Sequence, residues 1–420
     1  MTYDRYAAVW PEGSSPEKSS ANSDGLKTFS QHFLVYPFEL VRWPVDKTLV
    51  FVEDHHLYDK VDWTYEQIKN RGVSLKVLPA DGFGGGLEVE LAQLTGLKDQ
   101  VPNSTLKVSG FWALHHITDY RAEMKQEKIG GTGFFSGGDF RYENRGEEHF
   151  YGIGPNTSLG DGTSYRMERT TLALPVGYEF SDSLNVKGKF TYQNVNITNG
   201  EDGGRGVIDE IFVATGRQNI PGLAGDKILS WGLDLEHDNR DSKELPLQGG
   251  YERFHFSYNK GMESSSGYFK YRGEAAHFFK LFSDRRVGAL RGVVEHNNEV
   301  RGRDVPFFNM SRLGGYGAYP WLGDVHRGFR RDRFYDESLV LLNVEYRWTV
   351  WEYREWRMDS VLFWDEGQVF SDWGNFQFKD FEPSYGVGFR LSLEGEILLS
   401  IEMAGSHEGL QFYVKTRAPF

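Results

Sequence analysis

Apolar and polar side chains alternate with a two-residue period through most of the chain after residue 72. From 184 to 193, Leu, Val, Gly, Phe and Tyr alternate with Asn, Lys, Thr and Gln, and the same period recurs at 229–236, 253–258 and 385–393. Because a strand points successive side chains to opposite faces, this period predicts strands with one apolar and one polar face. Repeated at lengths of about ten residues, it is typical of a membrane barrel with a lipid-facing outside and a wet lumen.

Counting these runs predicts about sixteen strands, and single-chain bacterial outer-membrane barrels have an even number. The expected strands are residues 72–82, 85–95, 104–116, 118–128, 132–143, 163–181, 183–196, 225–238, 247–260, 266–281, 284–300, 337–351, 356–370, 382–394, 396–405 and 410–418. The long polar connections at 144–162, 197–224 and 301–336 are expected to be extracellular. The predicted fold class is therefore all-β, a transmembrane antiparallel β-barrel.

A soluble β-sandwich or an enzyme is the alternative, because a sandwich shows the same period with its faces inverted. Such a protein would need polar outward faces. Glycine favours the barrel, since Gly386 and Gly388 fall on the polar side of their strand, where a crowded lumen would need small residues. No GxSxG or HExxH motif and no Ser/His/Asp spacing supports an enzyme, so none is expected.

The chain is expected to have three parts. Residues 1–30 are polar and rich in Ser and Pro, which predicts a disordered leader. Residues 31–71 contain apolar positions near helical spacing within 44–69, which predicts one short amphipathic helix. That helix is either a plain packing helix or a plug or lid at the periplasmic mouth. Residues 72–420 form the barrel, which includes the long loop 301–336.

Composition narrows the possibilities further. The net charge of −13 and the lack of a basic stripe argue against a nucleic-acid partner. No stretch reaches the roughly 20 apolar residues of a spanning helix, which leaves a closed sheet as the way to cross a membrane. Cysteine is absent, which excludes disulfides and thiolate metal sites. The N-terminus has no basic and apolar signal segment, so we expect that Met1 replaces a removed signal peptide.

Metal binding is not expected. The histidine pairs at 55–56 and 115–116 are adjacent in sequence, and neighbouring side chains diverge on both strands and helices. We expect no cofactor either.

The candidate site centres on the glycine-rich run from Ser311 to Phe334, which contains five glycines. Near its end stands Arg327-Gly328-Phe329, a guanidinium fork beside a glycine that permits a sharp turn and an aromatic that can anchor it. Such a fork favours carboxylates. Glu345 and Asp365 lie on the polar faces of the next two predicted strands, so both can point into one interior and meet the arginine.

These features resemble the BamA/two-partner-secretion superfamily of outer-membrane barrels, also called the bacterial surface antigen family. Its members carry an [IV]RG[FY] tip on a long loop inside the lumen, where the arginine meets acidic residues of the following strands. The resemblance implies that Arg327 is the tip arginine and that Glu345 and Asp365 are its partners. His326 stands where the family has Val or Ile.

Two further segments are similar to superfamily motifs. The run from Asp238 to Gly249, with Asp238-Asn239-Arg240-Asp241 and Pro246, resembles the DxRD...P..G turn, and Tyr151-Gly152-Ile153-Gly154 resembles the YGxG segment. Superfamily members usually carry periplasmic POTRA modules before the barrel. The residues before the first expected strand show no such pattern, so we expect a variant without them.

The resemblance also implies a location and partners. We expect the cell outer membrane, with its lipids and lipopolysaccharide. The last strand has outward Phe412 and Val414 and a terminal Phe420, which together would be the address read by the barrel-assembly machinery.

The expected function is to aid insertion or translocation of protein or lipid through a lateral seam between the first and last strands. The alternative is a passive, plugged structural or lipid-binding barrel, as a monomer or a homo-oligomer. The arginine constellation is either a structural ion pair or a moving switch, and a buried ion pair fixes geometry more surely than it adds stability. The sequence does not identify the client.

Overall fold

The computed structural model describes residues 73–79, 83–90, 103–113, 117–200, 206–316 and 325–420. The predicted leader, the predicted helix within 44–69 and both histidine pairs lie outside these residues. The chain divides into two units, Met1–Lys69 and Asn70–Phe420. The described residues belong to the second unit.

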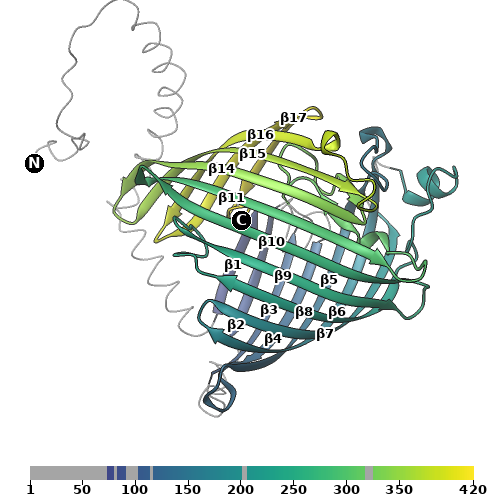
Figure 1. The fold of residues 1–420 in the computed structure, drawn as a ribbon, viewed down its shortest axis with the longest axis horizontal. Coiled ribbons are helices and arrows are strands. Elements are labelled where there is room, and N and C mark those ends of the chain that lie inside the picture. The colour runs from purple at the N-terminus through teal and green to yellow at the C-terminus, as the bar shows by residue number, and fades with distance from the viewer. Residues whose placement is uncertain (1–72, 80–82, 91–102, 114–116, 201–205, 317–324) are drawn as a thin grey trace, which may run out of the picture. The chain divides into compact units, whose positions relative to one another are not determined.

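Sixteen strands form one antiparallel sheet in chain order, which confirms the predicted all-β class and the strand number (Figure 1). They are β1 (Val73–Pro79), β2 (Phe83–Glu90), β3 (Ser104–Ala113), β4 (Ile117–Gln126), β5 (Phe134–Phe150), β6 (Thr163–Ser181), β7 (Leu184–Asn199), β8 (Asp226–Asp238), β9 (Gly249–Gly261), β10 (Gly267–Leu281), β11 (Ser283–Glu299), β14 (Ser338–Tyr353), β15 (Trp356–Phe370), β16 (Glu382–Leu393), β17 (Glu396–Ser406) and β18 (Gly409–Lys415). The short strands β12 (Ser311–Leu313) and β13 (Phe334–Asp336) pair with each other between β11 and β14.

In the described connections, the helical segments are single turns. These are η2 (Ile129–Gly131), η3 (Leu159–Asp161), η4 (Asp209–Val213), η5 (Phe307–Asn309) and η6 (Phe378–Asp380). Within the described part of the chain, no helix has the length and apolar content to span a membrane.

Some predicted boundaries were wrong at the end of the barrel that carries the long loops, here called the loop end. β5 continues to Phe150, although 144–150 were expected in a loop, because its inward side chains are covered from above. The Phe150 ring packs edge-on against Phe307 and Tyr335, at centroid distances of 5.3 and 5.1 Å. Connections that the sequence pattern marks as polar loops thus contain enough apolar residues to extend a neighbouring strand.

An apolar cluster built from the long loops and the strand ends packs at the loop end. Its buried members are Phe150, Tyr165, Met167, Val195, Ile197, Ile208, Phe212, Ile220, Ile228, Tyr268, Val305, Phe307, Phe308, Met310 and Tyr335. Burying so many large side chains fixes the loops to the barrel, since each contributes roughly 1.5–3 kcal/mol when removed from water.

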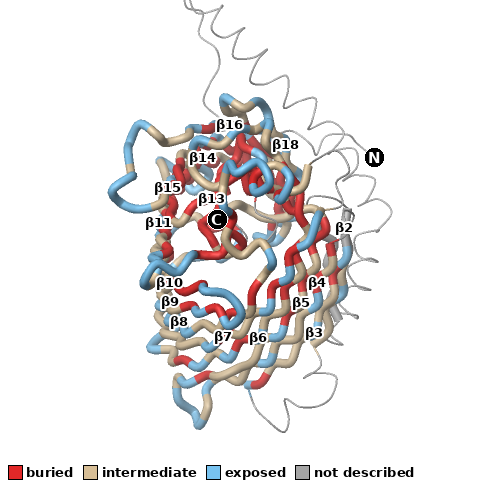
Figure 2. The backbone as a smooth tube through the Cα atoms, turned by 90° about the vertical axis from the view of Figure 1, so that its right-hand side faces the viewer, coloured by how far each residue is buried: buried red, intermediate tan, exposed pale blue. Residues whose placement is uncertain are grey.

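Burial along the strands is the reverse of that in a soluble protein (Figure 2). On β14, Asn343 and Glu345 are buried while Leu342 is 38% exposed, and on β16 Arg390 is buried while Tyr385 is 68% exposed. Charged residues inside and apolar residues outside are what a bilayer requires of a barrel. The soluble sandwich is therefore wrong.

The first and last strands form a seam that is not hydrogen-bonded in the described residues. Cα atoms of β1 and β18 approach within 8 Å. The order of hydrogen-bonded strands nevertheless starts at β1 and ends at β18, and the described residues show no pairing between these two strands. Each of these strands has seven residues and one paired neighbour. The seam is thus the one place in the described sheet where two adjacent strands are not joined by backbone hydrogen bonds.

The outward apolar face predicts the effect of a charge placed on it. Leu290 is 43% exposed on β11, opposite Val344. Leu290→Arg should destabilise the barrel in phosphatidylcholine vesicles by about 2–4 kcal/mol, because the charge would enter hydrocarbon. Urea unfolding followed by tryptophan fluorescence measures this. Val213→Arg, at a residue equally exposed in a loop, is the control and should change little; a loss at Leu290 as small as that of the control would place Leu290 in water.

Candidate functional site

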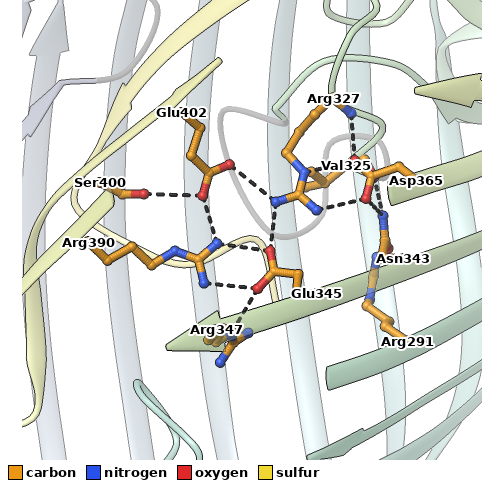
Figure 3. Close-up of polar contacts among 10 residues, drawn as sticks. All are labelled: Arg291, Val325, Arg327, Asn343, Glu345, Arg347, Asp365, Arg390, Ser400 and Glu402. Atoms are coloured by element: carbon orange, nitrogen blue, oxygen red, sulfur yellow. Dashed lines mark hydrogen bonds and ion pairs between the residues drawn. The ribbon is translucent and has the colours of Figure 1, made fainter. Parts of the chain in front are cut away.

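Arg327 lies inside the barrel, fully buried among carboxylates of three strands (Figure 3). Its Nε and Nη2 donate to the two oxygens of Asp365 at 2.8 and 2.7 Å. Its Nη1 donates to Glu345 at 2.6 Å and to Glu402 at 3.2 Å. The backbone N–H of Arg327 also donates to Asp365, at 3.0 Å. The structure therefore brings both predicted partners to the arginine and adds a third.

Strand parity delivers the carboxylates. Asn343 of β14 pairs with Asp365 of β15, and Glu345 pairs with Phe363, so all four side chains face the lumen. The guanidinium lies over the Phe363 ring, with Cζ 3.6 Å from the ring centroid. Gly386 faces Phe363 on the next strand, and a Cβ there would collide with that ring. A glycine on the lumen side thus makes room for a cation–π platform.

Two more arginines neutralise the carboxylates. Arg390 donates twice to Glu345, at 2.9 Å each, and once to Glu402, at 2.7 Å. Arg347 donates to Glu345 at 2.8 Å. We call these six residues the arginine cluster, namely Arg327, Arg347, Arg390, Glu345, Asp365 and Glu402. Three guanidinium groups face three carboxylates, so the buried charges balance.

The backbone around Arg327 is held as firmly as its side chain. The carbonyl of Gly328 accepts from Ser406 of β17 at 2.6 Å, and that of Phe329 accepts from Tyr413 of β18 at 3.1 Å. Gly328 has φ +98°, and a Cβ at this position would lie 2.6 Å from Cβ of Ser384. Glycine is required here both for its conformation and for the close approach.

Phe329 and His326 are the apolar part of the tip. Phe329 is buried in a cluster with Leu313, Phe334 and Val369, among others. The His326 ring lies 4.6 Å from the Phe329 ring. Burial lowers the pKa of His326 to about 4, so its imidazole is neutral at physiological pH. A neutral, buried imidazole takes the place that Val or Ile has in the family motif.

A second set of contacts fastens the C-terminal part of the loop. Arg333 donates to Glu408 and to Thr157, both at 2.6 Å. The YGxG segment meets the same region, where the N–H of Gly154 donates to the carbonyl of Tyr335 at 2.7 Å. The loop is therefore tied to its neighbours on the C-terminal side of the tip as well as at the tip itself.

The DxRD-like segment forms the turn between β8 and β9. Asp238 accepts from Nη2 of Arg240 at 2.7 Å, and Asp241 accepts from the N–H of Leu247 at 2.9 Å. Gly249, at φ +90°, opens the next strand. These bonds stabilise the turn and lie outside the arginine cluster.

The three C-terminal residues singled out from the sequence are not together. Phe412 and Val414 of β18 are 67% and 37% exposed on the outward face. β18 ends at Lys415 rather than near 418, and the chain then turns inward. The Phe420 ring packs against Phe278 on the lumen-facing side of the sheet, with 6.1 Å between the ring centroids.

Sequence reasoning missed Glu402, Ser406 and Tyr413. Glu402 is the one acidic residue between Ile401 and Met403, which are both outward and exposed, so its parity marked it as a lumen residue. Nothing in the pattern of β18 indicated that the hydroxyl of Tyr413 reaches the loop. In the residues that the structure describes, no group of three or more His, Cys, Asp or Glu side chains could hold a metal ion.

Residues 117–394 match the sequence profile of the Omp85 superfamily domain. The chain belongs to the Omp85 superfamily. This confirms the resemblance to BamA and two-partner-secretion barrels, and it places this Omp85 protein in the outer membrane. A search of curated proteins found no sequence that matches.

Solved structures agree in fold. BamA from Haemophilus ducreyi lacking POTRA domains 1–3 superposes with a TM-score of 0.57 at 15% identity, over 82% of this chain and 70% of that one. CdiB from Escherichia coli does so with a TM-score of 0.54 at 12% identity, over 82% of this chain and 62% of that one. The chain thus spans less than two thirds of the CdiB structure.

Charge balance in the cluster predicts the effect of removing its central cation. Arg327→Met leaves three buried carboxylates with two arginines, and should lower the free energy of unfolding by about 3–5 kcal/mol. Urea unfolding in vesicles measures the loss. Adding Asp365→Asn restores neutrality and should recover part of it. If the double variant loses the sum of the two single losses, charge balance is not the cause.

The geometry at Gly328 predicts release of the loop tip. Gly328→Ala should push the tip away from β16, because the added Cβ has no space, and expose the bonds after Arg330 and Arg331 to trypsin. Limited proteolysis of the folded barrel in vesicles would show cleavage that the native protein resists. Gly302→Ala is the matched control, since Gly302 also has positive φ but open space around it, and it should leave the tip protected.

Proposed function

We propose that this Omp85 barrel aids insertion or translocation of protein or lipid at the outer membrane through the seam between β1 and β18. The superfamily consists of outer-membrane barrels for protein insertion and translocation. The proposal is supported by the lack of described backbone pairing between β1 and β18. It is also supported by the hydrogen bond from Tyr413 of β18 to the lumen loop.

The seam is suited to bind another strand. An edge strand offers a row of unpaired N–H and C=O groups, and these are costly to leave in lipid. A client segment in extended conformation could satisfy them by adding a strand. The outward residues Leu410 and Phe412 of β18 are 73% and 67% exposed, so the edge presents an apolar face to a membrane-inserting partner.

The arginine cluster would keep the rest of the barrel in place while the seam changes. It joins the loop tip to β14, β15, β16 and β17, the four strands that lead to β18. Such a network favours a fixed scaffold over a moving switch, because all three arginines are paired within it. We propose this structural role for Arg327, Glu345 and Asp365.

Phe412 and Val414 are proposed as part of the address by which the barrel-assembly machinery recognises this chain. Their outward position supports that role. Phe420 packs on the lumen side in the folded barrel, so it could be read only before the barrel closes. Outer-membrane lipids and lipopolysaccharide are the other proposed partners.

A second candidate is a passive, plugged barrel, with a structural or lipid-binding role as a monomer or an oligomer. The observation that favours it is the content of the lumen. The loop tip with Arg327 and the C-terminal Phe420 both occupy it, and Phe420 lies 5.7 Å from Cζ of Arg347.

Disulfide cross-linking of the seam separates the two candidates, because the chain has no cysteine of its own. Cysteines near Leu75 in β1 and near Val414 in β18, tried in several registers, should lock the seam in native membranes. Oxidation is then expected to block insertion or export of outer-membrane clients or lipid, and reduction should restore it.

The control pair is Val387→Cys with Met403→Cys, at facing positions of the zipped strands β16 and β17. It should have no effect when oxidised. If the locked seam and the control behave alike, the passive barrel is the better account.

A further inference from the structure

The connection between β15 and β16 carries an unusual group of aromatic side chains. We call residues 371–381 the aromatic loop; its rings are Trp373, Phe376, Phe378 and Phe381. Phe376 is the centre, 6.0 Å from Trp373, 5.2 Å from Phe378 and 6.0 Å from Phe381 between ring centroids. Phe378 is nevertheless 84% exposed and Trp373 50% exposed. The rings gather together without being enclosed by the protein.

The aromatic loop folds back over the outside of the barrel. Gln368 and Phe370 share the outward parity of Leu362 and Trp364 on β15, yet they are only 2% exposed while those two are 44% exposed. The loop covers them: Nε2 of Gln368 donates to the carbonyl of Gln377 at 3.1 Å.

Ring contacts show the same placement. Phe370 lies 5.1 Å from Trp373 and 5.4 Å from Phe376 between centroids. His296 of β11 pairs with Ser338 of β14, and Ser338 pairs in turn with Phe370 of β15. The ring centroids of His296 and Trp373 lie 6.1 Å apart. The loop therefore lies over the ends of three adjacent strands on their outward face.

This position is the upper edge of the lipid-facing band. Along β11 the outward residues are apolar through Val294, which is 41% exposed, and the next outward residue is His296. On β15 the outward residues Leu362 and Trp364 are apolar, and Glu366 and Gln368 follow. The change from apolar to polar marks where hydrocarbon ends. Aromatic rings at this level of a membrane protein sit in the headgroup region.

We propose that the aromatic loop is a membrane anchor, with Trp373 and Phe378 seated at the boundary between headgroups and acyl chains at the loop end of the barrel. The partner is the lipid surface, because the rings continue the outward apolar face of β11, β14 and β15. In the sheet order, β16 and β17 separate this loop from β18.

The test is a depth measurement with a single label. Phe378→Cys introduces the only thiol of the chain at a highly exposed position, where folding should be unaffected. Folding is checked by electrophoresis in SDS without heating, in which the folded barrel migrates differently from the unfolded chain. The thiol is labelled with an environment-sensitive fluorophore, and the barrel is folded into phosphatidylcholine vesicles. These vesicles contain phosphatidylcholine brominated either near the headgroup or near the bilayer centre.

We expect shallow bromines to quench the label about twofold and deep bromines to quench it weakly, as an interfacial position requires. Ala214→Cys is the control, exposed in the loop between β7 and β8 whose Phe212 belongs to the apolar cluster at the loop end. Its label should not be quenched. A label at 378 that matches the control would place the aromatic loop in water and favour a protein partner. Stronger quenching by deep bromines would also overturn the proposal.

Discussion

The buried charge of Arg327 is the constraint on which the rest of the lumen depends. A guanidinium removed from water must be surrounded by carboxylates, and those carboxylates must themselves be neutralised. Asp365, Glu345 and Glu402 supply the first requirement, and Arg390 and Arg347 supply the second. Because the partners stand on four successive strands, the loop tip can occupy only one place, and those strands can adopt only one relative register.

The C-terminal side of the seam is consequently tied to the lumen. β18 pairs with β17 and is also tied to the loop through Tyr413, while β17 contributes Glu402 and Ser406 to the tip. β1 has β2 as its paired neighbour in the described sheet. The last strand of the sheet is therefore fastened both to its neighbour and to the loop inside the lumen.

The outside of the barrel obeys a different constraint from the lumen. There the partner is lipid, so Leu290, Trp364 and Tyr385 are exposed without penalty. Above this band the aromatic loop covers Phe370 and leaves Phe378 open. Charged residues meet inside and apolar residues gather outside for the same physical reason, because each kind is placed in the medium that solvates it best.

The sequence by itself determined the strands, their number and which face of each is polar, because a two-residue period survives any arrangement of the strands. It also placed Glu345 and Asp365 on lumen faces, and the superfamily motif pointed to Arg327. The tertiary structure decided that Glu402 and Tyr413 join the site and that Phe420 turns inward. Parity gives the face of a side chain but not its partner. Which inward residues meet depends on strand stagger and on the path of a loop, and both are set only when the sheet curls and its charges must be paired.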